Sequence, residues 1–194
     1  MKKVNAKQYL RLHLISKVSR YFTLCLLMVF ISSSQAELVT DSQIGKLNAI
    51  KLLANLARFV TWPAKSFSSA DAPFRYCIMG QDDIGTLLDD ALSSANANGH
   101  GFKVDRFSID QLDRVSDCHL VFIGVTTVDE AAAVFEKVGS SATITAGQIE
   151  GFTDNGGMVQ LIGSDRNVTL KLNKDRLDAT PLVVSSKLYS ASQH

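Results

Sequence analysis

Two short apolar runs, each containing a cysteine near its start, constrain the fold more than any other feature of the sequence. Residues 118–124 have the sequence Cys-His-Leu-Val-Phe-Ile-Gly, and residues 76–80 have the sequence Tyr-Cys-Ile-Met-Gly. Continuous apolar runs of this length, bounded by polar residues and glycine, are typical of strands buried on both faces, as in a parallel sheet. We therefore expect the rest of the chain to pack around these two strands.

Helical and strand-like patterns alternate along the remaining sequence. Apolar residues recur at helical spacing over 44–60 and predict a helix buried over much of its girth, which Trp62-Pro63 ends. The other expected elements are helices at 82–95 and 129–138, strands at 102–107, 143–145, 158–162, 168–172 and 182–184, and short helical turns at 174–178 and after Ser185. This order predicts an α/β fold, a single-domain sandwich with a largely parallel central sheet, helices on both faces and a C-terminal β-hairpin.

The first 36 residues have the organisation of a secretory signal peptide. Six basic and no acidic residues accompany an apolar core at 24–31, and the small residues Ser34 and Ala36 follow. The apolar core is too short to span a bilayer as a permanent helix. We expect cleavage after Ala36, a loose segment at 37–45 and an α/β domain at 46–194. The alternative is an uncleaved amphipathic anchor.

Charge and motif content exclude several classes of function. The chain has 20 basic and 19 acidic residues, and loss of the signal peptide leaves 14 against 19, a net charge of −5. This balance argues against nucleic acid as a partner. After the second of the glycines at 80 and 85, a phosphate loop would have lysine and then serine or threonine, but this chain has Thr86 and Leu87. The four histidines are scattered. We predict a protein without catalytic activity and without a cofactor or metal.

Two cysteines, Cys77 and Cys118, remain after cleavage, and export places them in an oxidising compartment. If their two strands are neighbours in a parallel sheet, the cysteines lie near the same end, where a spacing of about 4.8 Å permits a disulfide. The alternative is a pair of buried free thiols. A bridge would contribute about 4 kcal/mol in the chain-entropy model.

Several short motifs, taken in their order and spacing, resemble the YfiR family of periplasmic proteins over residues 46–192. The matching segments are Asn55-Leu-Ala-Arg-Phe59, Trp62-Pro63, Cys77-Ile-Met-Gly80, Cys118-His-Leu-Val-Phe-Ile-Gly124, Glu150-Gly-Phe152, Gly156-Gly-Met158, Leu170-Lys-Leu-Asn173 and Ser185-Ser-Lys-Leu188. The resemblance implies a non-catalytic periplasmic regulator. Such a regulator represses an inner-membrane diguanylate cyclase by binding its periplasmic sensor domain, and so lowers cyclic di-GMP and biofilm formation.

The same resemblance implies how repression ends and who the partners are. Release would come through sequestration by an outer-membrane lipoprotein, or through a redox or envelope signal. The oligomeric state is left open, and a homodimer is one alternative. A rival interpretation is a periplasmic small-ligand-binding module that feeds a membrane sensor. Its ligand would bind in the crevice at the carboxyl ends of the strands, near Gly80 and Gly124.

Three residues are candidates for contact with a protein partner. Arg58 and Trp62 lie four apart at the end of a predicted helix, so both would face one spot, and a Trp beside an Arg suits a binding hot spot. Phe152, between Gly151 and a polar loop, is the third candidate. The alternative for both aromatic residues is packing in the core, where most large aromatic side chains lie.

Overall fold

The structure is a computed structural model that describes residues 38–125 and 127–193. The expected signal peptide at 1–36 lies outside these residues, so its cleavage after Ala36 stays a prediction. Among the residues that the structure describes, no helix combines the length and apolar character needed to cross a membrane.

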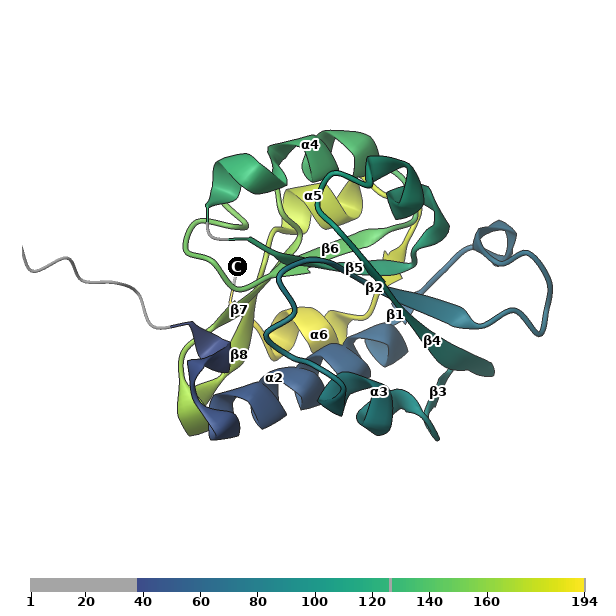
Figure 1. Cartoon of the computed structure of the whole chain (residues 1–194). Helices are drawn as coiled ribbons and strands as arrows, with labels where there is room; N and C mark the ends of the chain where they lie inside the picture. The colour runs from purple at the N-terminus through teal and green to yellow at the C-terminus, as the bar shows by residue number, and fades with distance from the viewer. Residues whose placement is uncertain (1–37, 126, 194) are drawn as a thin grey trace, which may run out of the picture. The chain divides into compact units, whose positions relative to one another are not determined.

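The chain folds around one seven-stranded sheet of order β3-β4-β2-β5-β6-β7-β8 (Figure 1). Its strands are β2 Phe74–Gly80, β3 Asn96–Ala97, β4 His100–Phe107, β5 Leu120–Gly124, β6 Ile144–Gly147, β7 Val159–Ile162 and β8 Thr169–Leu172. The strands from β4 to β7 run parallel, and β3 and β8 pair antiparallel at the two ends. This arrangement confirms the predicted α/β class, the largely parallel sheet and the C-terminal hairpin.

The strands β2 and β5 lie side by side in the middle of the sheet. Their register pairs Tyr76 with Leu120 and Gly80 with Gly124. All of β5 is buried, as is β2 from Tyr76 to Met79, because apolar side chains on both faces of each strand are covered. By contrast β4, which alternates in sequence, has only the two residues of β3 beyond it.

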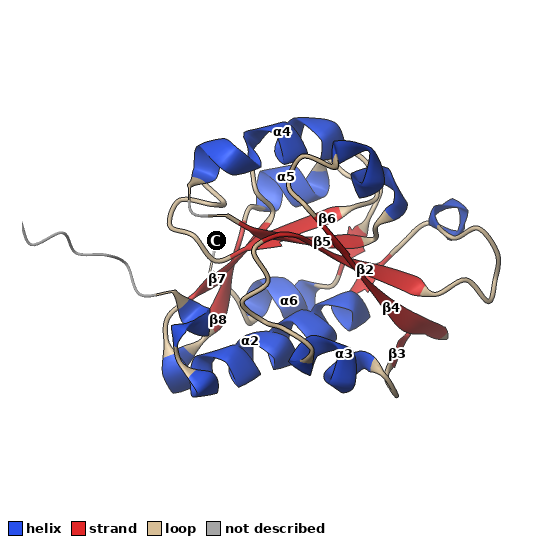
Figure 2. Cartoon of the chain, viewed as in Figure 1, coloured by secondary structure: helices blue, strands red, loops and turns tan. Residues whose placement is uncertain are grey.

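Helices cover both faces of the sheet, with α2, α3 and α6 on one side and α4 and α5 on the other (Figure 2). Their bounds are α2 Gln43–Leu56, α3 Leu87–Leu92, α4 Val128–Val138, α5 Lys174–Asp178 and α6 Ser186–Ser190. The two longest helices have side-chain caps at their first turns. Ser42 accepts a hydrogen bond from the Gly45 amide before α2, and Thr127 and Glu130 form a capping box at α4.

Two helices are shorter than their sequence patterns predicted. The helix expected over 44–60 ends at Leu56, and a 3-10 turn, η2 (Ala57–Phe59), leads into the strand β1 (Val60–Thr61), which pairs antiparallel with β9 (Val183–Val184). Distant pairing thus overrides local periodicity. The helix expected over 82–95 begins only at Leu87, because the Asp82 carboxylate accepts the Gly85 amide in a preceding turn.

The segment 37–45, expected to be loose, is ordered where the structure describes it. Val39 and Thr40 are buried in a 3-10 turn, η1 (Val39–Asp41), directly before α2. The Thr40 amide and hydroxyl both donate to Gln148 Oε1, at 3.2 and 3.0 Å. The segment therefore belongs to the domain, since it closes over the carboxyl ends of the strands.

Gly124→Ala tests how closely β2 and β5 approach. A Cβ at Gly124 would lie 1.8 Å from the Gln81 carbonyl oxygen, which is backbone and has no room to move. We expect a loss of about 1–3 kcal/mol or more in the free energy of unfolding, measured by urea denaturation. Gly101→Ala is the control, because a Cβ at Gly101 meets no atom within 4 Å. Equal stability of the two variants would contradict the close approach.

Candidate functional site

A disulfide joins Cys77 of β2 to Cys118, with Cα atoms 6.0 Å apart. Both residues are buried. The sequence predicted cysteines at the starts of two neighbouring strands, but Cys77 is the fourth residue of β2 and lies opposite Val121. The bridge therefore ties the middle of β2 to the connection that leads from η4 (Leu112–Asp117) into β5.

Ion pairs lie beside the disulfide at this end of the sheet. The Arg75 guanidinium is 2.9 Å from an Asp105 carboxylate oxygen and 3.6 Å from one of Asp117. Burial disfavours the charged form of Asp105, but hydrogen bonds and charge from Arg75 and Lys103 outweigh it and lower the pKa of this carboxyl. Asp105 therefore stays ionised at neutral pH and fixes Arg75 across β2 and β4.

Trp62 lies in the core rather than on the surface, with 7% of its area exposed. Its indole Nε1 donates to the Ala142 carbonyl at 2.8 Å, and its ring meets the Phe74 ring edge-on at 4.8 Å between centroids. This is the core packing that the sequence left open as the alternative. A buried indole with a satisfied N–H has little left to offer a partner.

Arg58 is exposed, but it does not share a face with Trp62. Its Nε donates to the Asn96 carbonyl and its guanidinium to Asn55 Oδ1, both at 3.4 Å. The expected common spot required a helix through both residues. Because Val60 and Thr61 are extended instead, the helical spacing that would align the two side chains is absent.

Phe152 is fully buried, which corrects its nomination as a surface contact. Its ring packs edge-on against Phe135 at 5.1 Å between centroids. A Cβ at Gly147 or Gly157 would come within 2.4 or 2.3 Å of the ring, so two glycines leave the space that the ring fills. Phe152 thus anchors the loop at 148–158 to the core.

Two of the large apolar side chains that are exposed in the described structure lie at the β1–β9 ribbon. Phe59, directly before β1, and Val183, in β9, are 39% and 67% exposed. Val60, which pairs with Val184 in the ladder, is buried. The Ser185 amide donates to the Phe59 carbonyl at 2.8 Å and extends the pairing. Together with Arg58 these two residues form the ribbon patch. Its outward apolar atoms are available to a partner.

The outer face of α2 carries two more exposed apolar residues. Ile44 and Leu47 are 45% and 43% exposed, so Leu47 does not lie on the inner face that the periodicity predicted. Both fall in the acid-free stretch, residues 42–70, which contains four basic residues and no aspartate or glutamate in a mature chain that is otherwise rich in acids. This run is a sequence signal that could have found these exposed residues, which apolar spacing alone did not find.

The crevice expected near Gly80 and Gly124 is filled by the chain itself in the described structure. A Cβ at Gly80 would lie 2.2 Å from the Gly124 carbonyl oxygen, and the Gln81 amide donates to that oxygen at 2.7 Å. Nearby, Gln148 Nε2 donates to Thr40 Oγ1 at 2.8 Å and to Asp83 Oδ2 at 3.4 Å. The small-ligand interpretation therefore gains no support at this place.

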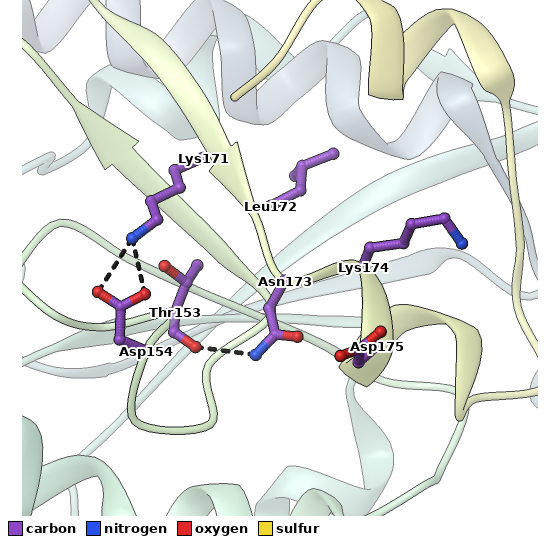
Figure 3. Close-up of a pocket in the computed structure, with 7 residues that line it drawn as sticks. All are labelled: Thr153, Asp154, Lys171, Leu172, Asn173, Lys174 and Asp175. Carbon is purple, nitrogen blue, oxygen red and sulfur yellow. Dashed lines mark hydrogen bonds and ion pairs between the residues drawn. The ribbon is translucent and has the colours of Figure 1, made fainter. Parts of the chain in front are cut away.

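An open pocket of about 350 Å³ lies where β8 meets the loop at 148–158 (Figure 3). Its lining consists of Thr153, Asp154, Lys171, Leu172, Asn173, Lys174 and Asp175. Lys171 Nζ donates to both oxygens of Asp154 at 2.7 and 2.9 Å, and Asn173 Nδ2 donates to the Thr153 carbonyl at 2.8 Å. Lys174 points away from this pair (Figure 3). These bonds fasten the loop to β8.

The arrangement is that of an α/β domain, and no group of three or more potential metal ligands occurs among the described residues. The chain belongs to the YfiR/HmsC-like family, whose model matches residues 48–193. This family is known for periplasmic regulators of diguanylate cyclases, which act by regulation rather than catalysis. None of the curated proteins compared with the chain matches it.

Phe152→Ala distinguishes core packing from partner contact. Removing a fully buried ring between two glycines leaves a cavity, so we expect the free energy of unfolding to fall by about 3–5 kcal/mol. Phe59→Ala is the matched control, because a half-exposed ring should cost about 1 kcal/mol or less. Chemical denaturation of both variants measures this. A similarly small loss of stability in both variants would contradict the burial of Phe152.

The disulfide has its own test. Cys77→Ser and Cys118→Ser should each lower stability by about 2–5 kcal/mol, because each frees the unfolded chain from the same constraint. The double variant should be no worse than either single variant, since the two residues act as one unit. Alkylation of freshly isolated protein without reductant, followed by intact-mass measurement, checks the bond directly. Two alkylated cysteines would refute it.

Proposed function

We propose that this protein is a non-catalytic periplasmic regulator that binds and represses the periplasmic sensor domain of an inner-membrane diguanylate cyclase. Repression would lower cyclic di-GMP and biofilm formation. Membership of the YfiR/HmsC-like family supports this function. The structural observation that carries it is the ribbon patch, where Val183 is 67% exposed on a two-stranded ribbon outside the main sheet.

The ribbon patch has the composition of a binding hot spot. Phe59 offers an aromatic ring, Val183 a stiff apolar side chain, and Arg58 a guanidinium that Asn55 and Asn96 already hold in place. Apolar and aromatic groups beside an arginine contribute most of the energy in many interfaces. A side chain held in position before binding also loses less entropy when the partner arrives.

The acid-free stretch indicates the chemistry of the partner surface. On α2 the exposed Ile44, Leu47 and Lys51 follow one another at helical spacing, and Arg58 continues the same line. A second copy of the chain would place cation against cation here, whereas an acidic surface with apolar residues would complement it. We therefore expect the sensor domain to present acidic and apolar side chains.

Repression then follows from differential affinity. A regulator that binds the inactive state of a sensor more tightly than the active state shifts the equilibrium toward inactivity, and it does so only by the ratio of the two affinities. Release by competition needs another molecule that covers the same surface. An outer-membrane lipoprotein bound at the ribbon patch would compete directly with the cyclase.

Val183→Asp tests the patch in cells and in solution. Deleting the gene should raise cyclic di-GMP, and the wild-type gene should restore it. The variant should fail to restore it, because a desolvated carboxylate opposes association, and affinity for the purified sensor domain should fall by about tenfold or more. Cyclic di-GMP is measured by mass spectrometry and affinity by calorimetry.

Ala133→Asp is the matched control for this test. Ala133 is exposed on α4, which covers the opposite face of the sheet from α2. This variant should repress and bind like the wild type. A deletion that leaves cyclic di-GMP unchanged would overturn the function, and equal defects in both variants would overturn the assignment of the surface.

A further inference from the structure

The connection between β1 and β2 contains a segment, residues 63–73, that two histidines hold to the sheet. We call it the strap, and Figure 1 shows it as the blue loop that extends beyond the strand ends. His119 Nε2 lies 3.0 Å from the Ser66 carbonyl oxygen, and His100 Nδ1 lies 2.7 Å from the Ala72 carbonyl oxygen. Each imidazole thus bonds one end of the strap through its backbone.

The Phe67 side chain holds the strap against the sheet, because its ring lies between the same two imidazoles. Its ring stacks on His100 at 3.7 Å between centroids with an interplanar angle of 5°, and on His119 at 4.3 Å with an angle of 25°. The neighbouring residues 68–71 are exposed. The two histidines therefore supply both the polar and the aromatic contacts that keep the strap closed.

The hydrogen bonds fix which nitrogen of His119 carries the proton. The Arg75 amide donates to His119 Nδ1 at 3.0 Å, so Nδ1 must be unprotonated. The single ring proton of neutral His119 is then on Nε2, where it is donated to Ser66. Both nitrogens are in use. An added proton has only Nδ1 to bind, and there it would confront the Arg75 N–H, one donor against another.

We propose that the strap is an acid-released latch, opened when a proton from solvent binds His119 Nδ1 and displaces the Arg75 amide. The ring must then leave its position between β2 and the strap, which frees Ser66 and Phe67 together. Opening moves Ala64 and Phe67, two residues of the strap that line a pocket of about 310 Å³ between the strap and the sheet. Its lining consists of Thr61, Trp62, Ala64, Phe67, Phe74, Ala97, Asn98 and His100.

His100 does not act in the same way. Its Nδ1–H is donated to the Ala72 carbonyl, so its bond to the strap does not need an unprotonated ring nitrogen. The other charged groups at this place are the Arg75 guanidinium and the carboxylates of Asp105 and Asp117, which are paired with Arg75. The positive charge of Arg75 already compensates the negative charge of these carboxylates, so they do not favour a charged His119.

The direction of the pH response follows from the surroundings of His119. Burial lowers the pKa of His119 below its ordinary 6.5, the bond to Ser66 opposes this in part, and the charges of His100 and Arg75 lower it further. A group with a lowered folded pKa stabilises the closed form above pH 6.5 and loses that contribution as the pH falls toward the folded pKa. The latch is closed at neutral pH and opens in acid.

Release of the strap is confined to the segment that follows Trp62. One residue, Trp62, separates β1 from the strap, and its indole is buried and bonded to the Ala142 carbonyl. When residues 63–73 loosen, β1 keeps this neighbour and its pairing with β9. This response is a property of the chain alone and does not depend on which partner it binds.

Trp62, the only tryptophan of the chain, reports on the latch. Its ring centroid is 6.4 Å from that of His119, and it lines the pocket. Between about pH 7.5 and about pH 5 we expect its emission to shift to longer wavelength while far-UV ellipticity stays constant. Over the same range, the protection of the Arg75 amide and of residues 64–72 against hydrogen exchange, corrected for the pH dependence of the intrinsic rate, should fall about tenfold or more.

Two variants assign the response to one ring. In His119→Asn the Oδ1 atom can still accept the Arg75 amide but does not titrate, so the pH response of emission and exchange should vanish. His100→Asn should keep it. If His119→Asn does not fold, nitrogen-15 spectra of wild-type histidine should show His119 as the Nε2–H tautomer and its titration should coincide with the emission change.

Three results would overturn the latch. The first is that emission and protection against exchange stay constant over the whole range. The second is that their pH response persists in a folded His119→Asn. The third is that ellipticity changes at the same midpoint as emission, because acid would then unfold the whole domain rather than the strap.

Discussion

The pairing of β2 with β5 is the constraint on which the rest of the structure depends. Gly80 and Gly124 end the two strands, and their backbones approach so closely that neither position has room for a Cβ. The disulfide from Cys77 to Cys118 fixes the entry to β5 against the same strand. With both faces of this pair buried, helices must cover both sides of the sheet, and the remaining strands extend it outward.

Sequence patterns predicted the parts of the fold that depend on local composition. The apolar runs at 76–80 and 118–124 were sufficient to predict buried parallel neighbours, and the hairpin of β7 and β8 followed from its spacing. The helix over 44–60 was predicted too long because hydrophobic periodicity contains no information about β9, more than a hundred residues away, which draws Val60 into a strand. Long-range strand pairing therefore determines where this helix ends, and a local sequence pattern cannot predict that boundary.

The candidate site was harder to predict for a related reason. Phe152 has the sequence environment of a surface loop, yet its ring fills space left by Gly147 and Gly157, and only the folded backbone brings these glycines together. Leu47 shows the converse. Its spacing fits the buried stripe of α2, but the inner face is already occupied by Ala49, Leu53 and Leu56. The distribution of charge would have been a better guide, because the acid-free stretch contains three of the four large apolar side chains found exposed among the described residues.

The β2–β5 pair is held rigidly, whereas the strap is held by contacts that depend on pH. The disulfide and the glycine contact hold β2 and β5 in one arrangement, and both are independent of pH near neutrality. The strap attaches to this same pair through His119, whose two nitrogens bond Arg75 of β2 and Ser66 of the strap. The strap can separate from the sheet only if the β2–β5 pair stays in place. Otherwise protonation of His119 would allow the strap and the strands to move together. The covalent tie beside His119 therefore allows acid to move the strap without moving the sheet.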